Sequence, residues 1–521
     1  MTKMAWIACT ASLPRIAASR VDNRSQLRHS FVMRLLTHFF ICALCALAPS
    51  IASARWIEAR SSNFVVYSYG SEDSLRRSVQ LLEDYDRLLR TLTGTTAPPS
   101  ASRLKVYLVS STDKLNQVEP VPSGVLAFYR ARVGGTAAFA VRGDRPGVGG
   151  EEVMLHEYAH HFATHYYPAY YPAWYSEGFA EYLMTARFTG DRIEVGRYNA
   201  GRAITLLRGT WLPVDRIFSG QLGGLSREQT GQFYAESWLI VHYLFADEAR
   251  REALKRYFAD LHRGVAETQA FRTAFGTDHK GFEAELKRYM AGRIAYSVMA
   301  RPPAGDVAIT VRPLSPAADD LLLPLAALMI GIPQPEREAA TFATIKTAAA
   351  RYPDDPYAQR VLARAEIGSG DRAAGTATID RLLQSAPNDA ELLYFRGLGD
   401  FYTGRKNAAV RVERFAAARP WFARAAAADP GYYTAIYRLA QTAPANGFPV
   451  SEETLAQLTT AHALAPLVGD IAVDAATALM ASRQYAAAEQ ALIPIASNPH
   501  GGNVERARAM LASIRQSNRQ D

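Results

Sequence analysis

The stretch His156-Glu157-Tyr158-Ala159-His160 decides how the first half of this chain is interpreted. Two histidines four residues apart lie on the same face of a helix, so both imidazoles can bind one metal ion. Glu157 stands between them and is placed to take a proton from a water molecule that the metal activates. This chemistry predicts a zinc hydrolase, and most sites of this kind cut peptide bonds.

A second stretch follows the motif: Trp174-Tyr175-Ser176-Glu177-Gly178-Phe179-Ala180-Glu181-Tyr182. Together the two stretches resemble the gluzincin metallopeptidases, whose third zinc ligand is a glutamate on the next helix in a W-x-x-E-G-x-A-like context. The resemblance spans roughly residues 56–295 and is greatest to bacterial peptidase-MA-like proteins that pair this domain with tetratricopeptide repeats. It implies that His156, His160 and Glu177 bind one zinc ion per chain and that Glu157 is the general base.

The same resemblance implies roles for two further residues. Glu181 lies one helical turn after Glu177, where gluzincins have a carboxylate that hydrogen-bonds a ligand histidine and fixes its tautomer. The reverse assignment, with Glu181 as the ligand, stays open. Gluzincins also supply a donor for the oxyanion of the tetrahedral intermediate from a later helix, and Tyr234 is the candidate, with His242 and Tyr243 as alternatives. Tyr234 is equally compatible with an ordinary core aromatic.

Other features near the motif have simpler explanations. His161 and His165 are also four apart, but Phe162 follows His161 where a base would stand, so we expect both histidines to pack or to line the rim. A strand expected over Thr136–Arg142 precedes the metal helix, as the substrate-aligning edge strand does in gluzincins, and a peptide could pair with it. The sequence upstream has no G-x-M-E-N-type motif, which favours an endopeptidase over an aminopeptidase.

The first 54 residues have the features of a secretory leader. Arg34 gives a positive start, Leu35–Ala48 is apolar, and Ala52-Ser53-Ala54 is a small-x-small cleavage site. We therefore predict a signal peptide from Met33 to Ala54 and a periplasmic or secreted mature protein without a stable membrane anchor. Residues 1–32 are then either a mis-assigned start or a long n-region. An uncleaved anchor is the alternative, although the apolar run is short for a membrane span.

The bulk composition limits which residue types can bind a metal in the mature chain and which partners are expected. All three cysteines, Cys9, Cys42 and Cys45, fall in the leader, so metal ligands in the mature chain have to be histidines and carboxylates. The formal net charge is +8, but residues 1–54 hold six basic side chains against Asp22 alone and contribute +5 of it. The remaining +3 gives little reason to expect a nucleic-acid partner.

The order of predicted elements indicates an α+β domain followed by an all-α region. Strands are expected at Trp56–Ala59, Phe64–Tyr69 and Leu104–Val109, and helices dominate from Ser226 onward. We assign residues 55–300 to a zincin-like metallopeptidase domain with a small sheet. The stretch 301–317 contains Pro302, Pro303, Pro313 and Pro316 and is predicted to be a linker.

Residues 318–521 show a repeat. Prolines after alanine-rich helices recur at spacings of 34, 43, 36 and 33 residues, at Pro353, Pro387, Pro430, Pro466 and Pro499. A period near 34 made of two helices is typical of tetratricopeptide repeats, and Ala418-x3-Phe422-x2-Ala425-x4-Pro430 matches the second helix of that repeat. We predict a helical-repeat solenoid that binds a protein partner. A generic helical bundle is the alternative.

These features give a leading function and two competitors. The leading hypothesis is a secreted zinc endopeptidase that acts on a peptide or protein substrate, with repeats that bind a partner protein. The first competitor is a scaffold or assembly protein that works through its repeats and carries a catalytically silent zincin domain. The second is a zinc hydrolase of a non-peptide amide.

Overall fold

The computed structural model describes residues 55–143, 150–167, 171–220, 222–302, 307–444, 450–497 and 502–517. The leader predicted over residues 1–54 lies outside these ranges. The described residues belong to one compact unit, Ala54–Asp521. In this part of the chain, every helix is too short or too polar to cross a bilayer.

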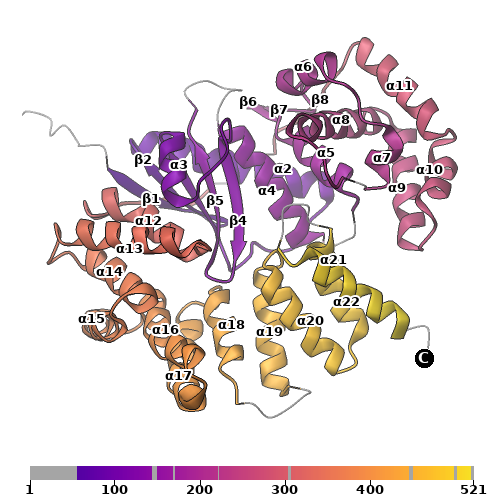
Figure 1. Ribbon diagram of the computed structural model, residues 1–521. Helices are drawn as coiled ribbons and strands as arrows, with labels where there is room; N and C mark the ends of the chain where they lie inside the picture. The colour runs from indigo at the N-terminus through magenta and orange to yellow at the C-terminus, as the bar shows by residue number, and fades with distance from the viewer. Residues whose placement is uncertain are drawn as a thin grey trace, which may run out of the picture. The chain divides into compact units, whose positions relative to one another are not determined.

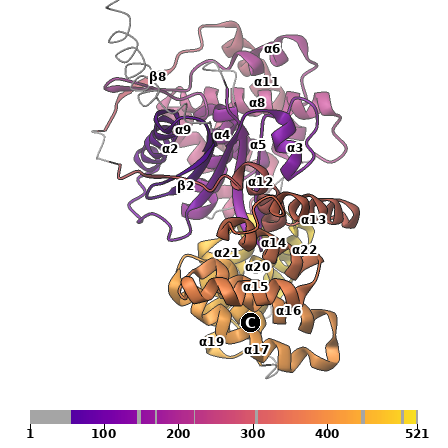
Figure 2. The same ribbon diagram turned by 90° about the vertical axis from the view of Figure 1, so that its left-hand side faces the viewer.

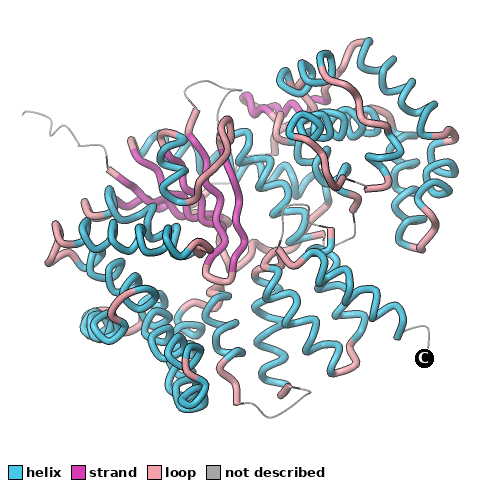
Figure 3. The backbone as a smooth tube through the Cα atoms, viewed as in Figure 1, coloured by secondary structure: helices cyan, strands magenta, loops and turns pink. Residues whose placement is uncertain are grey.

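A six-stranded mixed sheet organises the N-terminal half (Figures 1 and 3). Its strand order is β4-β5-β3-β2-β1-β9, and β2, β3 and β5 run parallel, while β4, β1 and β9 each pair antiparallel with their neighbours. The strands are β1 (Trp56–Arg60), β2 (Phe64–Tyr69), β3 (Leu104–Val109), β4 (Ala127–Arg132), β5 (Gly135–Val141) and β9 (Thr310–Pro313). The three strands expected at the start of the domain, and the strand expected over Thr136–Arg142, are therefore present.

The last strand of the sheet corrects the linker prediction. Thr310–Pro313 lies inside the stretch 301–317, yet it forms β9 and pairs with β1 in register Glu58↔Arg312. Arg312 binds both carboxylate oxygens of Glu58 at 2.8 and 2.9 Å, which ties β9 to the neighbouring strand. Pro313 is tolerated there because β9 is an edge strand, where a missing N–H costs no ladder hydrogen bond. The chain thus returns to the edge of the sheet, beside β1, before the repeats begin.

Helices cover both faces of this sheet. On one face, α2 (Glu72–Thr93) and α4 (Gly150–Tyr166) pack in the main hydrophobic core. On the other face, α3 (Thr112–Val118) and α12 (Ala318–Ile330) cover a row of stacked aromatic side chains, one from each of four adjacent strands. The row consists of Tyr67, Tyr107, Phe139 and Phe128, with neighbouring ring centroids 4.8 to 4.9 Å apart.

Among the described residues, a second, smaller sheet and seven helices complete the N-terminal half. Strands β6 (Arg187–Thr189), β7 (Arg192–Val195) and β8 (Ser297–Ala300) are antiparallel, and none of the three was expected from the sequence. The helices are α5 (Ala173–Leu183), α6 (Ala200–Arg208), α7 (Val214–Phe218), α8 (Arg227–Phe245), α9 (Glu248–His262), α10 (Glu267–Phe275) and α11 (His279–Ala291). Helix α8 is central, because it packs against α5, α6, α9 and α11.

The C-terminal region is an array of helical repeats. Each predicted proline that the structure describes lies in the turn that separates one helix pair from the next; Pro499 falls outside the described residues. The helices are α13 (Pro335–Ala349), α14 (Pro356–Ser369), α15 (Arg372–Ser385), α16 (Ala390–Lys406), η1 (Ala408–Val410), α17 (Arg411–Ala428), α18 (Tyr433–Gln441), α19 (Glu452–Leu464), α20 (Gly469–Ala481), α21 (Tyr485–Ala496) and α22 (Val504–Ser517). The long 43-residue spacing reflects longer helices: α16 and α17 have 17 and 18 residues, against 14 each in α14 and α15.

Helix α12 lies between the sheet and the repeats (Figure 2), and its side chains belong to the cores of both. Leu322, Leu323 and Ala326 pack with aromatic residues of the sheet, whereas Leu321 and Leu325 pack with α13 and α14. This helix is apolar around its circumference, as expected for an element buried between two layers. Residues 318–330 therefore belong as much to the sheet as to the repeats.

Candidate metal centre

The N-terminal end of helix α4, which precedes the motif in the sequence, packs closely against the sheet. A Cβ on Gly150, its first residue, would lie 2.3 Å from the Val141 carbonyl oxygen, so only glycine fits where the helix starts against β5. Met154, Leu155 and Tyr158 face the core, and the Tyr158 hydroxyl donates to Asp86 of α2 at 2.7 Å. The motif helix is thus held by the sheet on one side and by α2 on the other.

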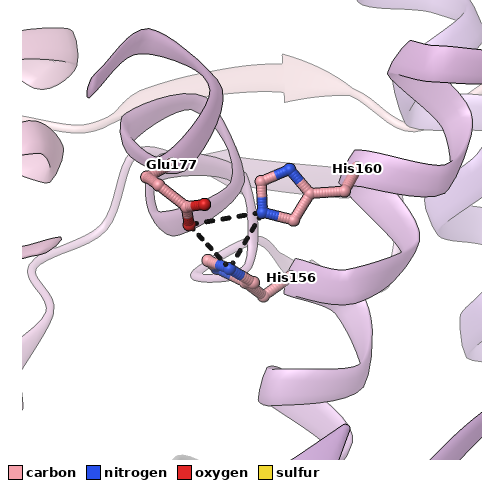
Figure 4. Close-up of side chains that lie close together, drawn as sticks. All are labelled: His156, His160 and Glu177. Atoms are coloured by element: carbon pink, nitrogen blue, oxygen red, sulfur yellow. Dashed lines mark hydrogen bonds and ion pairs between the residues drawn. The ribbon is translucent and has the colours of Figure 1, made fainter. Parts of the chain in front are cut away.

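The side chains of His156, His160 and Glu177 converge on one point (Figure 4). The Glu177 Oε2 atom lies 3.3 Å from the Nε2 atom of each histidine, and the two Nε2 atoms are 3.1 Å apart. Ligand atoms of a tetrahedral zinc ion with bonds of about 2.05 Å are separated by about 3.3 Å. The three atoms therefore have the spacing that one such ion requires. Within the described residues, this is the one group of His, Cys, Asp and Glu side chains close enough to hold a metal.

Glu177 reaches this point because α5 packs very closely on α8. A Cβ on Gly178 would lie 2.2 Å from the Ser237 carbonyl oxygen and 2.6 Å from Val241. The glycine next to the glutamate lets the two helices approach, which explains the E-G pair in physical terms. The Glu177 carboxylate is 1% exposed, so it is directed into the protein, toward the two imidazoles.

The outer nitrogens of the two imidazoles also have polar neighbours. His160 Nδ1 lies 3.2 Å from the Ser176 hydroxyl, and His156 Nδ1 lies 3.5 Å from Glu181 Oε1. Glu181 is itself buried and bound by Arg202, whose Nε donates to Oε2 at 2.8 Å. Glu181 thus lies on the far side of His156 from Glu177, and the three converging atoms do not include its carboxylate.

The carboxylates alter the protonation of His156. Burial, the largest single effect, lowers the pKa of His156, but Glu177, Glu181 and Glu157 together raise it to about 9. A cation is therefore favoured at this point of the protein, either as a proton on the imidazole or as a metal ion that replaces it.

Tyr234 and Glu157 lie beside the same centre. The Tyr234 ring centroid is 6.4 Å from that of His156, and the Arg202 guanidinium lies 5.2 Å from the Tyr234 centroid. Burial, and then the charges of Glu177 and Glu157, raise the pKa of the Tyr234 phenol, so it keeps its proton. A protonated phenol close to His156 can donate a hydrogen bond.

The remaining residues singled out from the sequence lie elsewhere. His242 bridges the Gly196 carbonyl and the Tyr289 hydroxyl, at 2.8 Å each, and Tyr243 donates to Glu285 at 2.6 Å. Both alternatives to Tyr234 are therefore used to hold helices together. His161 packs beside Tyr129 with its Nδ1 3.0 Å from the hydroxyl, and burial lowers its pKa to about 3.

The expectation for the edge strand is wrong in one respect. The strand that precedes the metal helix, β5, lies between β3 and β4 and has no free edge. Its hairpin partner β4 is the edge strand instead, and its Tyr129 contacts α4 through His161. Sequence alternation predicts both arms of a hairpin but does not say which arm pairs further into the sheet.

Arg202 and Asn199 are parts of the site that the sequence did not indicate. They lie on or just before α6, 21 and 18 residues after Glu181, and Asn199 Nδ2 is 3.4 Å from Glu181 Oε2. The intervening hairpin β6–β7 brings α6 next to α5. The sequence therefore contains no fixed motif spacing from which this proximity could be recognised.

Comparisons with known proteins found similar chains among solved structures. No family model matches the chain, and no curated protein matches it. A thermophilic TPR protein of Thermus thermophilus is 17% identical, with a TM-score of 0.30, over 38% of this chain and 98% of that chain. A structure of MamA from MSR-1 is 18% identical, with a TM-score of 0.22, over 34% of this chain and 87% of that chain.

Proposed function

We propose that this protein is a zinc-dependent hydrolase that cuts peptide bonds, with zinc held by His156, His160 and Glu177. The observation that carries the proposal is the spacing of two Nε2 atoms and one Oε2 atom, each 3.1 to 3.3 Å from the others. A donor set of two imidazoles and one carboxylate is that of catalytic zinc sites, which keep a fourth position for water or substrate.

Bound zinc supplies Lewis-acid chemistry, because it polarises a carbonyl and makes water more acidic. The residues around it supply the rest. Glu157 accepts the proton of the attacking water and passes it to the leaving amine. Tyr234 donates a hydrogen bond to the oxygen that becomes negative when the carbonyl is attacked. Glu181 and Ser176 hold the outer nitrogens of His156 and His160, which keeps the inner nitrogens directed at the ion.

An internal peptide bond of an unfolded protein is the substrate we favour. The edge strand β4 lies beside α4, and an extended chain can add to such an edge through main-chain hydrogen bonds. The leader predicted from Met33 to Ala54 places this activity in the periplasm or outside the cell.

Metal content and hydrolysis of an unfolded protein test the proposal together. We expect about one zinc per chain, as a single site implies. Glu157→Gln should keep the zinc and abolish cleavage, His156→Ala should lose the zinc, and Glu228→Gln on the exposed start of α8 should change neither. A protein that binds no zinc, or a Glu157→Gln variant with full activity, would contradict the proposal.

A second candidate is a scaffold that works through its repeats. The array of helix pairs from α13 to α22 supports it, because stacked helix pairs present extended surfaces for protein partners. Capture of partners from cells by wild type and Glu157→Gln separates the candidates. A scaffold should give the same partners and the same cellular phenotype with either chain, whereas a peptidase should lose its phenotype and accumulate uncut substrate.

A further inference from the structure

A cavity of about 780 Å³ lies between the sheet and the first helices of three repeats. Its volume is in the range of about 300 to 1,000 Å³ that holds small ligands. One wall is the face of β1, β2 and β3 that continues the aromatic row. The other wall is formed at the N-terminal ends of α14, α16 and α18. The cavity lies outside the metal centre, and no metal ligand lines it.

The sheet wall is basic. Arg60, Arg103, Lys105 and Arg312 line it, with Glu58 as its one carboxylate. Glu58 is already shared by Arg312 and by Arg60, which lies 2.6 Å away. Among the described residues, no carboxylate lies within ion-pair distance of Arg103 or Lys105, so these two cations are available to a ligand.

The repeat wall is acidic, and most of its acids are already engaged. Asp355 accepts from two N–H groups at the start of α14, and Asp389 and Glu391 hold Arg360 at 2.6 and 3.1 Å. Asp429 differs, because it is exposed and accepts one backbone N–H, from Gly431, while no cation within the described residues pairs with it. Asp429 is therefore the available anion of this wall.

The free charges of opposite sign lie on opposite walls without touching. Gly431 lies against the backbone of Ala101 and Ser102, which brings the Asp429 turn close to the segment that carries Arg103. Tyr357 also lines the cavity, and its buried hydroxyl makes no hydrogen bond to any described residue.

We infer that this cavity binds a short peptide with free termini, its carboxylate at Lys105 and Arg103 and its ammonium group at Asp429. A zwitterion is the ligand that satisfies both available charges at once, and charge-assisted hydrogen bonds of this kind are the strong ones. Tyrosines of both walls line the space between the two ends of the peptide. This site is separate from the proposed hydrolase centre.

Calorimetric titration with four trialanine peptides tests the inference: the free peptide, its N-acetyl form, its C-terminal amide and the doubly blocked form. We expect the free peptide to bind, and either block to weaken binding about tenfold, as the loss of one charged contact implies. Lys105→Met should reduce the effect of amidation, with Arg103 left as the remaining cation, and Asp429→Asn should abolish the effect of acetylation. Lys105→Arg keeps the charge and should keep the preference for a free carboxylate.

Control variants outside the cavity test whether peptide binding depends on this cavity. Lys346→Met and Glu336→Gln change exposed charges on α13 outside the cavity and should leave all four affinities unchanged. His156→Ala should also bind free trialanine normally, which distinguishes failure here from failure of the metal proposal. Absence of binding by all four peptides, equal binding of the free and doubly blocked forms, or an unchanged preference in a folded Lys105→Met or Asp429→Asn variant would overturn the inference.

Discussion

Arg202 binds both carboxylate oxygens of Glu181, and Glu181 in turn lies 3.5 Å from the outer nitrogen of His156. Both side chains of the ion pair are largely buried, with Glu181 at 2% and Arg202 at 29% exposure. The same guanidinium lies over the Tyr234 ring. One arginine therefore contacts both the carboxylate next to His156 and the ring of Tyr234.

Replacing Arg202 should weaken metal binding without removing any ligand. We expect Arg202→Met to lower zinc affinity about 10- to 100-fold, the usual effect of losing a partner that orients a metal ligand. Competition with a chromophoric chelator measures this. Arg192→Met, which changes an exposed arginine on β7, is the matched control. Equal affinities for the Arg202→Met variant and wild type would show that Glu181 is held in place by other means.

Tyr234→Phe should separate catalysis from metal binding. The variant loses only the hydroxyl, so zinc content should stay the same while kcat falls on the order of 100-fold, as for other donors to an oxyanion. A KM close to that of wild type would support a role in the transition state alone. If kcat is unchanged, Tyr234 is a packing residue and the donor lies elsewhere.

Gly178→Ala should disturb the site through the packing of two helices. Its new methyl group would meet the Ser237 carbonyl at 2.2 Å, so α5 and α8 must separate and carry Glu177 away from the histidines. We expect a loss of about 1 to 3 kcal/mol in the free energy of unfolding, together with weaker zinc binding. Gly231→Ala in α8 is the control, because its Cβ would meet nothing within 4 Å and alanine favours helices. A stable Gly178→Ala protein with normal zinc affinity would contradict this packing.

Glu236 should make stability depend on pH. Burial raises its pKa from 4.5 to about 7, so between these values the folded state holds a proton that the unfolded state has lost. Its contribution is therefore full below about pH 4.5 and is lost as the pH rises through about 7. Glu236→Gln removes this dependence and keeps an acceptor for the Leu212 N–H.

Urea unfolding of both proteins across this pH range measures the effect. Relative to Glu236→Gln, wild type should lose up to about 3 kcal/mol between the acidic and the alkaline limit. The exposed Glu228→Gln on the same helix should run parallel to wild type at every pH. Parallel curves for the Glu236→Gln variant and wild type would mean that Glu236 is ionised in both states.

The motif residues were predictable because they are close in sequence and follow helical periodicity. His156, Glu157 and His160 lie within one and a half turns of one helix, so their common face follows from the backbone alone. Glu177 required a second helix, and its placement depends on the close approach at Gly178, which the E-G pair indicated only through the family resemblance. The roles of these residues stay predictions until metal and activity are measured.

Other features of the site and of the fold depend on contacts between distant segments, which no local sequence pattern indicates. Arg202 reaches Glu181 because the β6–β7 hairpin returns the chain, and those strands have only three and four residues. Strand β9 is equally short and ends at a proline, so its composition resembled a linker. The repeats were easier, since a proline follows each alanine-rich helix pair and three of the four spacings lie between 33 and 36 residues.

The position of helix α12 affects how the protein unfolds. Because its two sides complete the core of the sheet and the core of the first repeats, neither core can lose this helix without exposing large apolar surfaces. The two halves should therefore melt in one cooperative transition, and a ligand that binds the repeats should raise the temperature at which the metal centre unfolds. A chain cut before Ala318 would expose Tyr107 and Phe139 to water, so we expect the half that contains the sheet and the repeats to behave as a single folding unit.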